Sequence, residues 1–132
     1  MTKDLLDFIC RLEGYKTNVK NLHWAASNLT VHMELDDILD ELSDFEDNVA
    51  EDAQAIYGQI TVGDVYGISS VLDNPVDLLI AIRADLANMK DLLTDKMYVG
   101  IINEVEDYWH KVNIRIYRMR QALKGKIGRA SC

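Results

Sequence analysis

Residues 58–75, GQITVGDVYGISSVLDNP, decide how this chain folds, because they separate two long helical patterns. The stretch holds three glycines and lacks apolar residues at regular helical spacing, so it is not expected to continue either helix. It ends in Asp73-Asn74-Pro75, a strong helix start in which a capping residue precedes proline at the first helical position. We therefore expect residues 58–73 to be a long connection, with room for one short helix.

Four helical patterns surround this connection. Apolar residues recur at three- and four-residue steps over residues 3–26, from about residue 30 to 57, over residues 75–93, and from about residue 96 to 124. The break between the first two patterns offers two competent N-caps, Asn28 and Thr30. A tight break at Thr94-Asp95 separates the last two.

The lengths of these links predict the topology. A tight turn forces neighbouring helices to run antiparallel, whereas the long connection can travel the length of a bundle. One long crossover between the second and third helices is the ferritin-like version of the four-helix bundle. The predicted fold is therefore all-α, with one such bundle over residues 1–124 and a short, frayed basic tail over residues 125–132.

Composition limits the class of protein. The chain has 132 residues, of which 48% are hydrophobic, and this suits a single domain with a real core. Its formal charge of −8 argues against nucleic acid as the default partner and suits a protein that attracts cations. Cys10 and Cys132 are too few and too far apart for a disulfide framework. No signal-peptide pattern or membrane-spanning segment is recognised, so we expect a soluble, cytoplasmic protein.

Acidic residues on the second helix gather on one side of it. On a helical wheel that advances about 100° per residue, with His32 at zero, three acids fall within about 100° of it: Asp36, Asp47 and Glu51. The apolar residues of the same helix fall between about 220° and 300°: Leu35, Ile38, Leu42, Phe45 and Val49. The candidate ligands thus do not face the bundle core, unlike those of common di-iron bundles, which point inward.

Distance along this helix adds a second constraint. His32 and Asp36 are one turn apart, as are Asp47 and Glu51, but the centres of the two pairs are separated by roughly 22 Å at about 1.5 Å per residue. No ion can bind both pairs of one chain. Two copies of the helix could pack antiparallel about a two-fold axis near residues 41–42. The His32/Asp36 pair of each chain would then face the Asp47/Glu51 pair of the other, which gives two sites per dimer. Imidazole and carboxylate ligands with open positions suit iron redox chemistry better than a closed zinc site.

Several of these residues also have a plainer structural interpretation. An acidic outer helix face is usually just solvated, and a lone histidine such as His23 is more often hydrogen-bonded and half-buried than a ligand. Asp107 and His110 on the fourth helix have the spacing of an inward ligand pair, but no glutamate partner is evident, so we expect them to be structural. Trp24 and Trp109 are most simply core or interface filling.

The order of the candidate ligands resembles that of the Dps mini-ferritins, the DNA-protection proteins from starved cells. In this chain the motif reads His23-Trp24, then H-x-x-x-D at residues 32–36 and D-x-x-x-E at residues 47–51. The likeness covers most of the chain, from the first helix through the fourth. The linker between the two histidines is a few residues shorter than is usual in the family. The lysine-rich N-terminal extension with which some members bind DNA does not appear in this sequence.

This resemblance implies a shared iron site and an activity. His23 and His32 would come from one subunit, together with Asp36 as a ligand or as the orienter of one. Asp47 and Glu51 would come from its two-fold mate, with Glu51 able to bridge two irons. Such proteins are ferroxidases that oxidise Fe(II), with hydrogen peroxide a favoured oxidant, and store it as a ferric mineral in a hollow dodecamer. DNA binding is expected to be weak or absent, because the chain is acidic.

Two other classes of protein remain compatible with the sequence. One is a shell protein that compacts DNA and makes little use of iron. The other is a plain structural helical bundle whose acids are merely solvated. The placement of both histidines counts against the second, since solubility does not require it.

Overall fold

The computed structural model describes residues 1–68 and 71–131, with side chains described as far as residue 125. These residues form no strand and four helices, with the 3-10 turn η1 (Lys96–Tyr98) leading into the last: α1 (Lys3–Ala25), α2 (Leu29–Tyr57), α3 (Pro75–Leu92) and α4 (Val99–Ser131). The predicted all-α class is confirmed.

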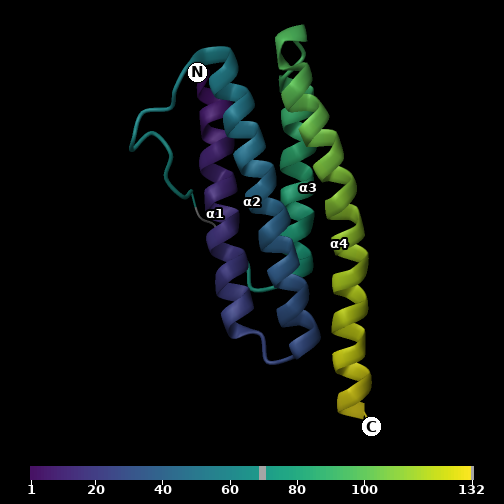
Figure 1. Ribbon diagram of the computed structural model, residues 1–132. Coiled ribbons are helices and arrows are strands. Elements are labelled where there is room, and N and C mark those ends of the chain that lie inside the picture. The colour runs from purple at the N-terminus through teal and green to yellow at the C-terminus, as the bar shows by residue number, and fades with distance from the viewer. Residues whose placement is uncertain (69–70, 132) are drawn as a thin grey trace.

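The four helices pack side by side as a bundle with one long crossover (Figure 1). α1 and α2 form one antiparallel hairpin, α3 and α4 form the other, and α2 packs on α4. After α2 the chain returns along the outside of the bundle to the end where α2 began, so α3 runs parallel to α2 (Figure 1). The predicted four-helix bundle with its crossover between the second and third helices is confirmed.

Capping side chains set where the helices begin. Four residues that each precede a helix accept hydrogen bonds from backbone N–H groups of its first turn: Thr2, Asn28, Asn74 and Asp95. Of the two candidate caps for α2, Asn28 is the one used, because its Oδ1 accepts from the N–H groups of Thr30 (2.8 Å) and Val31 (3.2 Å). α2 ends at Tyr57 and is followed by Gly58, whose φ of +94° suits a residue without a side chain.

The core is an apolar cluster to which all four helices contribute. Phe45 of α2 stacks on Tyr108 of α4 with ring centroids 4.3 Å apart, and meets Phe8 of α1 edge-on at 6.1 Å. The face of α2 that was predicted to turn inward is buried throughout: Leu35, Ile38, Leu42, Phe45 and Val49. The wheel therefore assigns the two faces of α2 correctly.

The smaller contact between α1 and α3 is held by an ion pair. Arg11 donates two hydrogen bonds to Asp85, at 2.8 and 2.9 Å, and the Tyr15 hydroxyl donates a third to the same carboxylate at 2.6 Å. Burial, and next the bond to Asp85, raise the pKa of Tyr15 above its usual value. The hydroxyl therefore keeps its proton and remains a donor.

The crossover is fastened to α1 by contacts with its backbone. The Ile68 N–H donates to the Cys10 carbonyl oxygen at 3.1 Å. The side-chain amide of the buried Asn18 forms two hydrogen bonds with the backbone of Leu72. It donates to the carbonyl oxygen and accepts from the N–H group, both at 2.9 Å. Gly14 lies under the same segment, so closely that a Cβ there would be 1.9 Å from the Ile68 carbonyl oxygen.

The crossover and the end of α4 need separate comment. The described parts of the crossover, residues 58–68 and 71–74, contain no short helix. α4 was expected to end near Lys124 before a frayed tail, but it continues to Ser131, so the expected tail is helical as far as it is described. This stretch has no proline, and its lysine, arginine and alanine residues are good helix formers.

None of the helices in the described part of the chain is long and apolar enough to cross a membrane.

We expect Gly14→Ala to lower the free energy of unfolding by about 1–3 kcal/mol, the usual cost of forcing a methyl group into a packed contact, because the new Cβ would collide with the Ile68 backbone. Gly125→Ala is the matched control. Nothing lies within 4 Å of the added methyl group, so helix propensity should raise stability by up to about 1 kcal/mol. Urea unfolding followed by circular dichroism measures both, and equal effects would contradict close packing at Gly14.

Candidate metal centre

The end of α1 and the beginning of α2 bring three potential metal ligands together. Because the turn at residues 26–28 is short, the last turn of α1 lies beside the first turns of α2. His23 comes from α1, and His32 and Asp36 come from α2. One potential ligand atom from each side chain lies within 4.8 Å of the others, and no second group of this kind is found among the described residues.

His23 turns its Nε2 atom toward Asp36. This nitrogen lies 2.8 Å from Oδ1 of Asp36, but the direction of approach is not that of a hydrogen bond, so the buried Nε2 has no hydrogen-bond partner in the described part of the chain. Adjacent ligands that each lie about 2.1 Å from one ion are about 3 Å apart. The contact is therefore close to the spacing that a shared metal ion requires.

His32 is oriented by the main chain of α1. Its Nδ1 lies 3.1 Å from the carbonyl oxygen of His23, and since a carbonyl oxygen can only accept, Nδ1 must carry the hydrogen. In the neutral ring the lone pair is then at Nε2, the nitrogen that remains able to bind a metal. The two imidazole rings pack on each other, with centroids 3.7 Å apart and planes tilted by 32°. The short linker between the two histidines thus allows His23 to reach α2.

Two imidazoles and one carboxylate form a donor set that suits a divalent transition metal. The His23 side chain is 19% exposed and that of Asp36 54%, so the centre is shielded on the side of α1 and open on the side of the carboxylate. Three ligands leave coordination positions free for a substrate or for further ligands. The donor set alone does not choose between iron, zinc and similar ions.

Asp47 and Glu51, the other two predicted ligands, lie outside this group. Both are exposed on α2, about three and four turns beyond Asp36. The structure therefore brings together three of the five predicted ligands within one chain and leaves the other two on the solvent-exposed part of the same helix.

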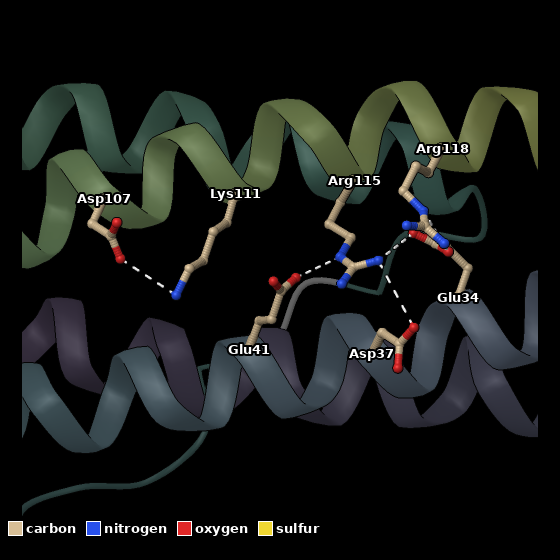
Figure 2. A network of polar contacts seen from close by, with 7 residues as sticks. All are labelled: Glu34, Asp37, Glu41, Asp107, Lys111, Arg115 and Arg118. Atoms are coloured by element: carbon tan, nitrogen blue, oxygen red, sulfur yellow. Dashed lines mark hydrogen bonds and ion pairs between the residues drawn. The ribbon is translucent and has the colours of Figure 1, made fainter.

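The second candidate ligand pair, on α4, forms a surface contact instead. Asp107 pairs with Lys111 one turn further along the helix, at 3.3 Å (Figure 2). His110 is exposed. This agrees with the structural interpretation of both residues.

Large apolar side chains lie in the open near the metal centre. Trp24 is 72% exposed, Leu29 69% and Met33 59%. Of the two tryptophans, Trp109 packs against the core, whereas Trp24 does not. Exposed apolar residues that cluster beside potential ligands mark a surface suited to a partner.

Two buried glutamates on α2, Glu34 and Glu46, are absent from the sequence-based predictions. Both side chains are only 7% exposed. On the helical wheel they lie near 200° and 320°, just outside the two edges of the apolar stripe. That position is the signal that could have revealed them, because a long side chain at the edge of a stripe is covered by the neighbouring helix.

Arg115 joins Glu34 and two other acids of α2 to α4 (Figure 2). Its guanidinium donates to Glu34 at 2.7 Å and to Glu41 at 2.5 Å, and it lies 3.9 Å from Asp37. Arg118 adds a second cation 3.3 Å from Glu34. Burial by itself lowers the pKa of Arg115, but the hydrogen bonds to Glu41 and Glu34 outweigh it, so the net shift is upward and the guanidinium stays charged.

Comparison of the chain with protein-family models, with curated proteins and with solved structures finds no match. The function is therefore inferred from the residues of the candidate centre and their geometry.

We expect Arg115→Met to lower the free energy of unfolding by about 3 kcal/mol, because it leaves the buried Glu34 and the half-buried Glu41 without their main cation. Arg118→Met is the control on the same helix. It should cost less than about 1 kcal/mol, because that side chain is 56% exposed. Urea denaturation compares the two variants, and losses of equal size would contradict the central place of Arg115.

Proposed function

We propose that this chain is a mini-ferritin of the Dps kind. It oxidises Fe(II) at sites shared across a two-fold dimer and stores the ferric product in a hollow, dodecameric shell in the cytoplasm. The observation that carries the proposal is the convergence of His23, His32 and Asp36, combined with two exposed acids, Asp47 and Glu51, on the same face of α2. In this proposal iron is the substrate of the centre.

Iron is one of the ions that fit these ligands, and the open coordination positions favour it over a structural zinc ion. Two imidazoles and one carboxylate with open positions make the donor set typical of non-haem Fe(II) sites, whereas structural zinc sites are closed by four ligands. Oxidation also requires that peroxide or dioxygen can approach the metal. The exposed side of the centre at Asp36 provides this access.

The second pair of acids argues for a site shared between two chains. Asp47 and Glu51 are roughly 22 Å along α2 from His32 and Asp36, too far to bind the same ion. An antiparallel copy of α2, related by a two-fold axis near residues 41–42, would place the acids of one subunit opposite the histidine and aspartate of the other. Each dimer would then contain two complete sites.

The face of α2 that contains His32, Asp36, Asp47 and Glu51 also has the composition expected of a dimer interface that binds cations. Leu29 and Met33 lie on this face, near 60° and 100° on the wheel, and a second copy would cover them. Asp40 and Asp44 add further exposed acids, and α2 contains no lysine or arginine. Two such faces repel each other unless cations lie between them, and iron at the shared sites would supply those cations.

Asp47→Asn and Glu51→Gln should each slow Fe(II) oxidation at least about tenfold while leaving the helical content intact, since each change keeps the shape and removes an anionic ligand. Asp40→Asn is the matched control, because this acid is exposed on the same face but lies outside the ligand set. Ferric absorbance after addition of peroxide to anaerobically loaded protein gives the rate. Wild-type rates in both ligand variants would refute their role.

Subunit mixing tests whether the site is shared. The double variant Asp47→Asn/Glu51→Gln and the double variant His32→Ala/Asp36→Ala should each be inactive alone. Dissociated and reassembled together, they should form heterodimers with one intact site and one doubly damaged site, and so regain activity that neither parent has. A site built within one chain could regain none.

Native mass spectrometry provides the control for this experiment, because it counts heterodimers directly. Confirmed heterodimers without recovered oxidation would exclude the shared site. A closed shell of wild-type chains that does not oxidise Fe(II) would instead favour the DNA-compacting or structural alternative.

A further inference from the structure

Glu13, Lys16 and Glu46 form a polar cluster at the seam between α1 and α2. The Lys16 amine lies 3.1 Å from Oε1 of Glu13 and 3.2 Å from Oε1 of Glu46. Glu46 is the most enclosed of the three, with 7% of its side chain exposed, against 20% for Lys16 and 36% for Glu13. The cluster has no part in the proposed iron chemistry.

The charges of this cluster do not balance if both glutamates are ionised. One ammonium group would then face two carboxylates, and the second oxygen of Glu46, Oε2, would be a buried acceptor without a donor in the described part of the chain. A buried acceptor without a partner costs about 1–3 kcal/mol, and two carboxylates that share one ammonium group repel each other. A single proton between the two carboxyl groups removes both costs.

We propose that Glu13 and Glu46 together form a proton-binding site at the α1–α2 seam, in which Oε2 of Glu46 carries the proton and donates it in a hydrogen bond to the Glu13 carboxylate, while Lys16 neutralises Glu13. The cluster then contains one positive charge, one negative charge and one neutral acid. Every buried polar atom of Glu46 has a partner in this arrangement.

The electrostatics of the neighbouring groups agree with this assignment. Burial, and next the hydrogen bond with Glu13, raise the pKa of Glu46 to about 8, against the lowering effect of Lys16. The hydrogen bond from Glu46 lowers the pKa of Glu13, and Lys16 and Lys20 act in the same direction. Among the described residues, the Glu46 carboxyl group makes no hydrogen bond or ion pair with α3, α4 or the crossover.

The direction of the pH dependence follows from these two shifts. Glu46 binds its proton more tightly in the folded chain than in the unfolded one, so its contribution to stability is complete below its unfolded pKa of about 4.5 and is lost as the pH rises through about 8. The contribution of Glu13 has the opposite sign and is lost as the pH falls through its lowered pKa. The seam is therefore most stable while it holds one proton.

Carboxyl ¹³C NMR of the glutamate-labelled wild-type chain at pH 6.5 tests the site directly. One protonated glutamate is expected, and its signal should be missing in Glu46→Gln, whose amide can replace the carboxylic acid as donor to Glu13. Glu34→Gln is the matched control, because Glu34 is equally buried but accepts from Arg115 and forms an ion pair with Arg118, and this variant should keep the protonated signal. Ionised signals from all glutamates of the folded wild-type chain would overturn the proposal, whatever the variants do.

Urea unfolding across pH 5 to 9 provides a second readout. The unfolding equilibrium constant of the wild-type chain should rise relative to that of Glu46→Gln, by at most about tenfold per pH unit because one proton is released, and the difference should level off above about pH 8. Measuring the two chains side by side removes the contribution of the three histidines, which both contain. Parallel pH profiles of the two chains would contradict a proton on Glu46.

Discussion

The short turn at residues 26–28 is the constraint on which the rest of the structure depends. Asn28 closes it by capping α2, so α2 must return along α1 in a single register. That register places His23 beside Asp36, and ten residues further along both helices it places Glu13 beside Glu46. One seam therefore contains both the candidate metal centre and the proton-binding pair, separated by about 15 Å.

α2 distributes its acids by their angle around the helix. Those at the edges of the apolar stripe, Glu34 and Glu46, are covered by neighbouring helices and meet cations from α4 and α1. Those opposite the stripe, including Asp47 and Glu51, remain exposed. The covered acids stabilise the bundle only when their cations are in place, whereas the exposed acids are available to bind a ligand from outside the chain.

The parts of this structure that are encoded locally could be predicted from the sequence. Link lengths indicate the topology, and the period of the apolar residues in α2 indicates which face is buried. The spacing of His32 and Asp36 places both on one helical turn. A choice between two equally competent caps, Asn28 and Thr30, depends on the path of the turn and could not be made in advance.

Contacts between helices were harder to predict, because they depend on register. The approach of His23 to Asp36 was suggested by family resemblance and not by any local pattern. The contact between Lys16 and Glu46 joins residues thirty positions apart, and that between Arg115 and Glu34 joins residues eighty-one apart. Side chains this distant meet only after packing has fixed the relative rotation of the helices, which periodicity within each helix does not specify.

The lack of lysine and arginine in α2 has a consequence for the order of folding. Lys16 is close in sequence and reaches Glu46 as soon as the α1–α2 hairpin forms, whereas Arg115 and Arg118 reach Glu34 only when α4 docks. Contacts between nearby segments form faster than distant ones, because less chain entropy is lost in closing the loop. In a hairpin of α1 and α2 alone, Glu34 and Glu41 would therefore have no cation beside them. The docking of α4 supplies Arg115 and Arg118, so that these carboxylates can be covered in the packed bundle.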